Sequence, residues 1–227
     1  MKKLHLIFLI IIVTILASCL GNSNKPDNNP DSTKTQITKT NALSSGKYKI
    51  KSGIIEMNIE TMGMIQKMKM YFDDFGNKEC VETNYTMDMG IAGKIEMHSK
   101  VITGNGYIYN IDLTKKSGTK TKITTNEKNK TNDIDFNNMD EKIMKEMHIT
   151  KAGTEKVMDK TCDKFNMNNP ELKMKSSYSV WNGIPLKYEM NMSGIVAKAT
   201  TTKIEENATI PAEIFEIPAD IKITEIK

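Results

Sequence analysis

Short runs of alternating polar and apolar residues dominate the chain from Gly46 to its end. Lys47–Lys51, Lys67–Phe72 and Leu186–Met192 each place apolar side chains at every second position, which is typical of a half-buried strand. Gly53 interrupts this phase, and the apolar positions that follow it have the other parity. The change of parity predicts a bulge or a bend at this point.

Turn-forming residues separate the runs. Gly104-Asn105-Gly106 and Asn182-Gly183 are typical of tight hairpins, because Asn and Gly accept a positive φ. Asp73–Asn77 predicts another turn. The strand expected over Ile195–Ile204 is followed by Pro211–Pro218, whose two prolines suit a segment at an edge of the sheet or capping it.

One stretch, residues 138–147, has the spacing of a helix. Its apolar residues fall at positions 139, 143, 144 and 147, which form one helical face. Asn138 can cap its first turn, and Asp140 and Glu141 suit the positive end of the helix dipole. His148 follows the last turn, where a polar group is favoured by the same dipole.

Successive strands without crossover helices pair antiparallel, and a single helix then covers one face. We therefore predict a mainly β (α+β) domain over residues 46–227. Its architecture is a curved antiparallel sheet, or half-barrel, with one short helix packed on or in it. A chain of ~180 residues is long enough for one hydrophobic core.

Residues 1–18 have the organisation of an export signal, with Lys2 and Lys3 before a short apolar run that ends in small residues. The run is shorter than the ~20 apolar residues of a membrane-spanning helix. Leu16-Ala17-Ser18-Cys19 resembles a bacterial lipobox. That resemblance implies cleavage before Cys19 and acylation of its sulfur, so that Cys19 anchors the protein in membrane lipid; a secretory signal without lipidation is the alternative.

Residues 19–45 follow as the lipidated cysteine and a polar tether that has too few apolar groups to fold. As a random coil of ~25 residues it averages roughly 25–30 Å between its ends. Leu20 stands where an Asp marks inner-membrane retention in lipoproteins, so the resemblance favours the outer membrane, on either its periplasmic or its surface face.

Charge argues against nucleic acid as a partner. The formal net charge is +4, and two of the positive charges, Lys2 and Lys3, belong to the export signal. A nucleic-acid-binding protein shows a concentrated basic face instead. Every basic residue other than His is lysine, so the bidentate grip of arginine on phosphate is absent from the chain.

The chain contains 17 methionines, and several form Met-x-Met pairs. Residues i and i+2 of a strand share one face, so a pair could present two thioethers to a soft ion such as Cu(I). The residues of this possible metal site are Met62, Met64, Met68, Met70, Met87, Met89 and His98. Methionine is also a flexible filler of apolar cores, and we favour this interpretation over metal binding.

A third interpretation is that the methionines line a cavity. Flexible methionine side chains adapt to apolar ligands of different shape. The candidate lining of this cavity consists of apolar residues at alternating positions of three predicted strands. These residues are Met68, Met70, Phe72, Met97, Tyr188, Met190 and Met192.

Cys80 and Cys162 remain once Cys19 is acylated. In an exported chain they could form a disulfide, and two buried free thiols are an equal alternative. Two cysteines without neighbouring histidines do not make a structural zinc site.

Catalytic motifs are missing from the sequence. It contains no G-x-S-x-G elbow, no H-E-x-x-H helix and no Walker-type loop. A nucleophile–base pair would need His98 or His148 beside a Ser or Cys. We therefore expect neither an enzyme nor a bound cofactor.

The C-terminal half carries a recognisable pattern: Gly153-Thr154-Glu155, then Cys162 with Phe165, then Trp181 with Gly183-Ile184-Pro185-Leu186, and finally Phe215-Glu216-Ile217-Pro218. It resembles an uncharacterised-domain family of exported bacterial lipoproteins, related in shape to the LolA/LolB lipoprotein carriers. The resemblance covers roughly residues 46–220. It implies a half-barrel open at one end, with a helix that partly plugs an apolar cavity, and it supplies no catalytic residues.

Three functions remain from the sequence. The first is a lipid-anchored envelope protein that binds an apolar ligand, a lipid or acyl chain, in the half-barrel. The second is soft-metal binding through the Met-x-Met pairs. The third is a structural or partner-binding envelope module.

Overall fold

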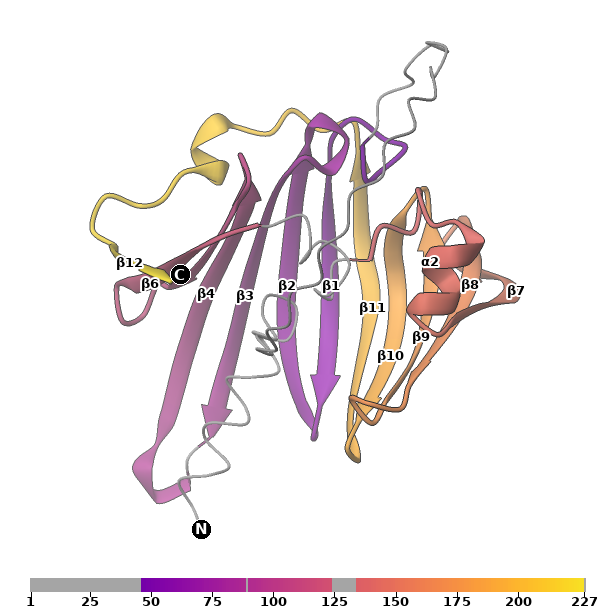
Figure 1. The fold of residues 1–227 in the computed structure, drawn as a ribbon. Helices are drawn as coiled ribbons and strands as arrows, with labels where there is room; N and C mark the ends of the chain where they lie inside the picture. The colour runs from indigo at the N-terminus through magenta and orange to yellow at the C-terminus, as the bar shows by residue number, and fades with distance from the viewer. Residues whose placement is uncertain (1–45, 89, 124–133, 227) are drawn as a thin grey trace, which may run out of the picture.

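The computed structural model describes residues 46–88, 90–123 and 134–226. They form one sheet of twelve strands in the order β12-β6-β5-β4-β3-β2-β1-β11-β10-β9-β8-β7 (Figure 1). The strands are β1 (Gly53–Thr61), β2 (Met64–Asp73), β3 (Lys78–Asp88), β4 (Lys94–Gly104), β5 (Tyr107–Asp112), β6 (Ser117–Lys122), β7 (Ile149–Val157), β8 (Lys160–Asn169), β9 (Met174–Trp181), β10 (Ile184–Met192), β11 (Ile195–Glu206) and β12 (Lys222–Ile226).

Neighbouring strands pair antiparallel, with one exception: β12 runs parallel to β6. The sheet curves without closing, and β7 and β12 form its two ends (Figure 1). This architecture confirms the predicted half-barrel. Two of the predicted hairpins are also confirmed, since Asn105 and Asn182 lie in tight turns with φ values of 53° and 53°, each followed by a glycine at positive φ.

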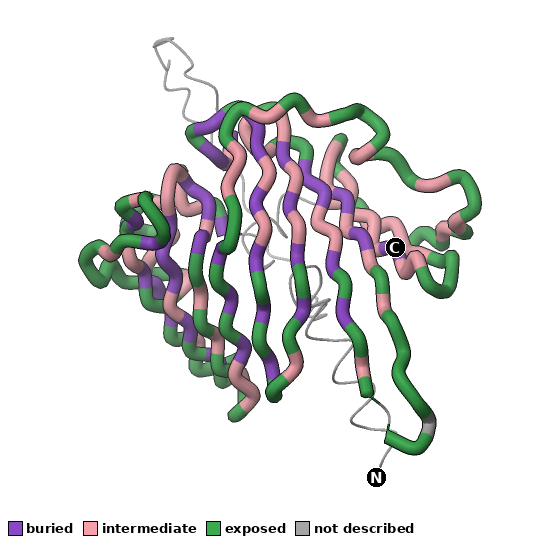
Figure 2. Tube along the Cα trace, turned by 180° about the vertical axis from the view of Figure 1, so that it is seen from behind, coloured by how far each residue is buried: buried purple, intermediate pink, exposed green. Residues whose placement is uncertain are grey.

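The two faces of the sheet differ in character because successive side chains of a strand point to opposite sides. One face, which we call the inner face, carries a row of directly paired residues across five strands: Phe165, Tyr178, Tyr188, Ala199 and Ile59. The opposite, outer face of the central strands carries Lys and Glu side chains. Seen from behind, buried and exposed residues alternate along these strands (Figure 2).

One α-helix is present in the described part of the chain, α2 (Glu141–Glu146), on the inner side of β7–β9 (Figure 1). It is shorter than predicted, and its N-cap is Asp140, whose side chain accepts a hydrogen bond from the Ile143 N–H. Asn138 was the wrong cap. Its own N–H and side chain bond Asp135, and its Nδ2 also donates to the Gly46 carbonyl, so residues 135–138 form a turn.

Residues 47–51 alternate in the sequence but do not form the predicted strand. The Tyr48 N–H donates to the Phe75 carbonyl and the Lys49 N–H to the Asn182 carbonyl, so the segment crosses the ends of β2, β3 and β9 instead of pairing along one strand. Its alternation still has a structural basis, because Tyr48 and Ile50 are buried in the main core cluster. The predicted change of phase at Gly53 marks the start of β1, and the bulge itself lies at Glu56/Met57.

The C-terminal segment caps the outer face near the β3–β5 end. After β11 it forms the 3₁₀ helix η3 (Ala212–Phe215), whose Ile214 and Phe215 pack against a cluster centred on Cys80 and Ile102. The chain then adds β12 to the sheet edge. In the parts of the chain that the structure describes, no helix is long and apolar enough to cross a bilayer.

Candidate ligand-binding site

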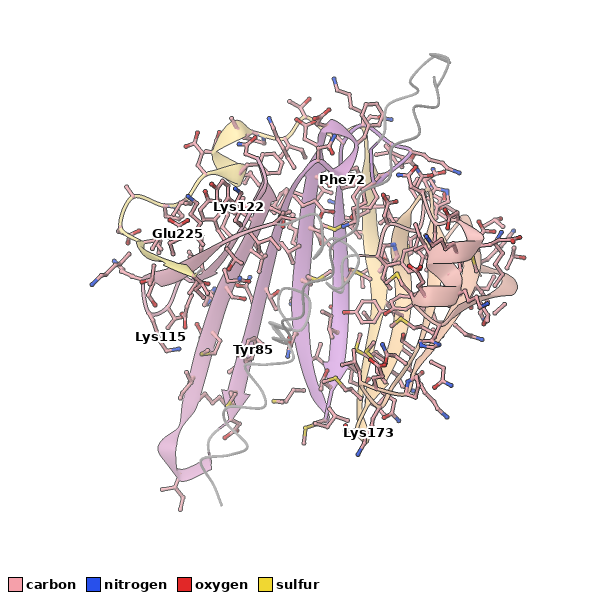
Figure 3. All side chains as sticks on the ribbon, in the orientation of Figure 1. Phe72, Tyr85, Lys115, Lys122, Lys173 and Glu225 are labelled. Carbon is pink, nitrogen blue, oxygen red and sulfur yellow. The ribbon has the colours of Figure 1, made fainter. Side chains whose placement is uncertain are left out.

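A pocket of about 420 Å³ lies on the inner face, over β3–β6 and β12. This volume falls within the ~300–1,000 Å³ of small-molecule sites. Figure 3 labels Tyr85 on β3 and Lys115 near the β6 end of the sheet, which both line the pocket. Its other lining residues are Met97, His98, Ser99, Val101, Asn110, Ile111, Asp112, Ser117, Gly118, Thr119 and Thr224.

Strand register explains how these residues meet. One row of directly paired inner-face residues runs from β2 to β6: Met68, Thr83, Ser99, Asp112 and Ser117. Only its β2 member, a thioether, is apolar, and the row continues through hydroxyls to a carboxylate and a further hydroxyl. The inner face therefore becomes polar from β3 onward along this row.

The next row repeats this gradient. It runs through Val81, Val101, Asn110, Thr119 and, on β12, Thr224. Its apolar half lies on β3 and β4, and its polar half on the last three strands. The members of both rows on β4, β5, β6 and β12 line the pocket, whereas Met68, Thr83 and Val81 lie beyond it on β2 and β3.

Asp112 and Lys115 form an ion pair at the polar end. The Lys115 Nζ lies 2.7 Å from Asp112 Oδ2, and the Lys115 N–H donates to Oδ1 at 2.8 Å. Partial burial alone would raise the pKa of Asp112, but these hydrogen bonds outweigh it and hold the pKa below its ordinary value. Asp112 is therefore a carboxylate at neutral pH.

Tyr85 lies directly opposite Met97 and is buried. Burial raises the pKa of Tyr85, and the negative charge of Asp112 raises it further. The phenol therefore stays protonated and can donate or accept a hydrogen bond. Asn110 contributes an Oδ1 that is enclosed and has no hydrogen-bond partner among the described residues.

A second apolar area lies beneath α2, at the β8–β10 end of the inner face. Met167, Met174, Phe165 and Tyr178 are buried there, and Met144 from α2 packs onto them. Tyr178 and Tyr188 face each other across β9 and β10, with ring centroids 6.2 Å apart. Burial raises the pKa of both phenols, so this area is uncharged at neutral pH.

All seven predicted lining residues lie on the inner face, but the structure does not bring them into one pocket. Met97 lines the pocket described above. Met68, Met70 and Phe72 belong to the main buried cluster. Tyr188, Met190 and Met192 pack beneath α2. Whether they contact a ligand stays a prediction.

Sequence reasoning missed the polar end of the pocket. Ser99, Asn110 and Asp112 alternate with apolar residues, as polar residues do in any half-buried strand. The β6 residues Ser117 and Thr119 belong to a strand with no apolar side chain, so no periodic pattern indicated it. Only the pairing of β5 with β6, and of β6 with β12, places these groups together.

The methionines of the possible metal site are spread over several places. Met62 lies in the β1–β2 turn with a φ of 52°, Met64 begins β2, and Met68 and Met70 share the inner face. Met87 lies on β3, while Met89 falls outside the described residues. His98 lies on the opposite face of β4 from Met97, and no group of three or more His, Cys, Asp or Glu able to hold a metal is found in the described ranges.

Cys80 and Cys162 are both free and buried, so the disulfide alternative is wrong for this fold. Cys80 lies on β3 in the cluster beneath η3, and Cys162 lies on β8 in the main core cluster. Five strands separate β3 from β8. Neighbouring strands are ~4.8 Å apart, whereas the Cα atoms of a disulfide lie within about 7 Å. Cys19, the export signal, the tether and the polar loop expected at 126–132 lie outside the described residues.

No protein-family model matches the sequence, and no curated protein matches it. An uncharacterized conserved protein from Thermus thermophilus has a similar structure, with a TM-score of 0.52 and 8% identity. The match covers 78% of this chain and 92% of that protein. At this identity the similarity shows the fold alone.

Two further solved structures are similar at lower scores. MucB, solved in complex with MucA(peri), matches with a TM-score of 0.44 and 10% identity, over 81% of this chain and 60% of that protein. A domain from Vibrio parahaemolyticus described as an outer membrane lipoprotein-sorting protein matches with a TM-score of 0.33 and 9% identity, over 76% of this chain and 91% of that domain. The structural neighbours thus include a lipoprotein-sorting domain, and at these scores neither match carries a conclusion about function.

Proposed function

We propose that this protein is a lipid-anchored component of the cell envelope that binds an apolar or amphiphilic ligand, a lipid or acyl chain, and has no catalytic role. The observation that carries the proposal is the pocket of about 420 Å³ on the inner face of an open sheet. Its apolar wall includes Met97 and Val101.

The burial and the chemistry of the pocket-lining residues favour a binding role over a catalytic one. The only acid that lines the pocket among the described residues, Asp112, is engaged by Lys115, and its lowered pKa makes it a poor general base at neutral pH. Methionine side chains adapt to guests of different shape. These features suit retention of a flexible chain.

Anchoring is the second part of the proposal. The acylation that the lipobox resemblance implies at Cys19 would attach the protein to the outer membrane, with residues 19–45 between the anchor and the sheet. A protein held beside lipid, with a pocket on the inner face of its sheet, is well placed to take up a lipid-like guest.

Native mass spectrometry tests the proposal on the mature chain, residues 19–227, with Cys19→Ser to remove the acyl group. We expect a bound mass that fragments into a lipid. Met97→Trp fills the pocket and should abolish this mass, while Glu96→Trp, which places the same bulk on the exposed outer face of β4, should retain it. Equal retention by both variants would contradict the proposal. So would a bare mass for the Cys19→Ser chain without a pocket substitution, exported behind a cleavable secretory signal through a lipid-containing envelope.

A further inference from the structure

The polar groups of the pocket gather at one end, and most of them can accept hydrogen bonds. Asp112 and Asn110 lie on β5, directly opposite Ser117 and Thr119 of β6. Thr224 of β12 continues the second row. A ligand in this pocket therefore meets a carboxylate, an amide and several hydroxyls on one side only.

Asp112 has spare acceptor capacity. Its carboxylate accepts bonds from the Lys115 N–H and Nζ and from the Thr114 N–H, and a carboxylate offers about four lone-pair positions. The Lys115 side chain is 62% exposed, so it can turn to solvent if a ligand cation replaces it. An anionic group would instead meet the Asp112 charge at short range.

Asn110 supplies an independent observation. Its Oδ1 is enclosed at the pocket wall and has no hydrogen-bond partner among the described residues. Buried carbonyl oxygens are nearly always paired, and an unpaired one is destabilising. A donor brought by a ligand would satisfy it once the Asn110 amide turns toward the pocket.

The opposite side of the pocket is more apolar, with Met97 and Val101 of β4 beside the phenol ring of Tyr85 on β3. Four strand spacings separate β12 from β3, the outermost strands that line the pocket, a distance of ~19 Å at about 4.8 Å per strand. This span suits an extended alkyl chain that lies across the strands.

We propose that the pocket selects an amphiphile whose head donates hydrogen bonds, an amine or a polyol, with the head at Asp112 and Asn110 and the tail directed toward Met97 and Val101. This inference rests on the proposed ligand-binding function and specifies its ligand class. Amphiphiles with an anionic head are disfavoured.

Calorimetric titration of residues 19–227 carrying Cys19→Ser tests the assignment. The probes are dodecylamine, 1-monododecanoylglycerol and dodecanoic acid, which share a twelve-carbon chain, each below its micellar concentration at neutral pH. We expect the amine, the glycerol ester or both to bind about tenfold more tightly than the acid, which corresponds to ~1.4 kcal/mol. The affinities of the amine and the ester, compared with each other, show whether the pocket prefers a cationic amine head or an uncharged polyol head.

Asp112→Asn keeps the shape and removes the charge, and it should weaken amine binding about tenfold while acid binding stays equal or improves. The matched control is Asp159→Asn in the β7–β8 turn, an exposed aspartate far from the pocket, which should change nothing. Asn110→Leu removes the amide and should weaken binding of the glycerol ester. The head-group assignment is wrong, and the proposed function stands, if the acid binds as tightly as the amine and the ester. The same conclusion follows if Asp112→Asn leaves amine binding unchanged and Asn110→Leu leaves ester binding unchanged. If none of the three probes binds, the proposed function itself fails.

Discussion

The Tyr48 ring meets the Phe72 ring edge-on, with centroids 4.9 Å apart. Tyr48 comes from the irregular segment that precedes β1, and Phe72 lies near the end of β2 and is 1% exposed. The contact attaches the start of the domain to the inner face of the sheet. It also places the largest fully buried side chain of the described residues at the junction of β1, β2 and the N-terminal segment.

Phe72→Ala should therefore destabilise the domain strongly. Removal of a buried phenylalanine leaves a cavity and costs about 3–5 kcal/mol. The measurement is urea unfolding, with an unchanged m-value. Ile65→Ala on the same strand is the control, because Ile65 is 63% exposed and its truncation should change the free energy of unfolding by less than about 0.5 kcal/mol. Similar losses in both variants would contradict the burial described here.

Gly183→Ala should cost more than Gly194→Ala, although both glycines lie in hairpin turns with φ near +90°. A Cβ on Gly183 would lie 2.5 Å from the Lys47 carbonyl oxygen, while a Cβ on Gly194 meets nothing within 4 Å. Gly194→Ala should thus show only the left-handed backbone penalty of ~1–2 kcal/mol. Unfolding curves of the two variants measure the difference, and equal costs would argue against the close passage of residue 47 over this turn.

Cys80 and Cys162 should resist thiol reagents in the folded protein. Burial raises the pKa of Cys80 to about 12 and also raises the pKa of Cys162, so little thiolate is available to react. In the chain with Cys19→Ser, we expect no labelling by iodoacetamide before denaturation and two labels after it. An intact mass lower by two hydrogens would show a disulfide and contradict the positions of β3 and β8.

The Asp112–Lys115 pair predicts a small pH dependence of stability. The folded pKa of Asp112 lies below its unfolded value, so its contribution is complete above pH ~4 and is lost as the pH falls through the folded pKa. Because Lys115 is largely exposed, Asp112→Asn should lower the free energy of unfolding at pH 7 by no more than about 1 kcal/mol. The difference between variant and wild type should shrink toward pH 2 in urea titrations. If the difference in free energy of unfolding between variant and wild type stays constant with pH, the Asp112–Lys115 pair is not its cause.

Much of the fold was predictable because its determinants are local. Asn105-Gly106 and Asn182-Gly183 specify hairpin turns by backbone preference alone, and the alternation in Leu186–Met192 identifies β10 with its inner-face side chains. The antiparallel half-barrel follows from such units once no crossover helices are found.

Long-range pairing determines the features that sequence reasoning missed. Residues 47–51 alternate like a strand, yet their backbone partners are Phe75 and Asn182, far away in the sequence. The strand β6 has the sequence SGTKTK, whose lack of apolar residues conceals it until β5 and β12 flank it. The polar end of the pocket depends on that strand, and for this reason the predicted site included Met97 but not Asp112.

Methionine methyl NMR tests ligand binding on the inner face most directly. In residues 19–227 carrying Cys19→Ser and ¹³C-methyl methionine, titration with 1-monododecanoylglycerol below its micellar concentration should shift the Met97 resonance, because Met97 lines the pocket. Met158, in the β7–β8 turn and 52% exposed, should not shift. An unperturbed Met97, or a Met158 shift as large as that of Met97, would contradict the binding of an amphiphile in this pocket.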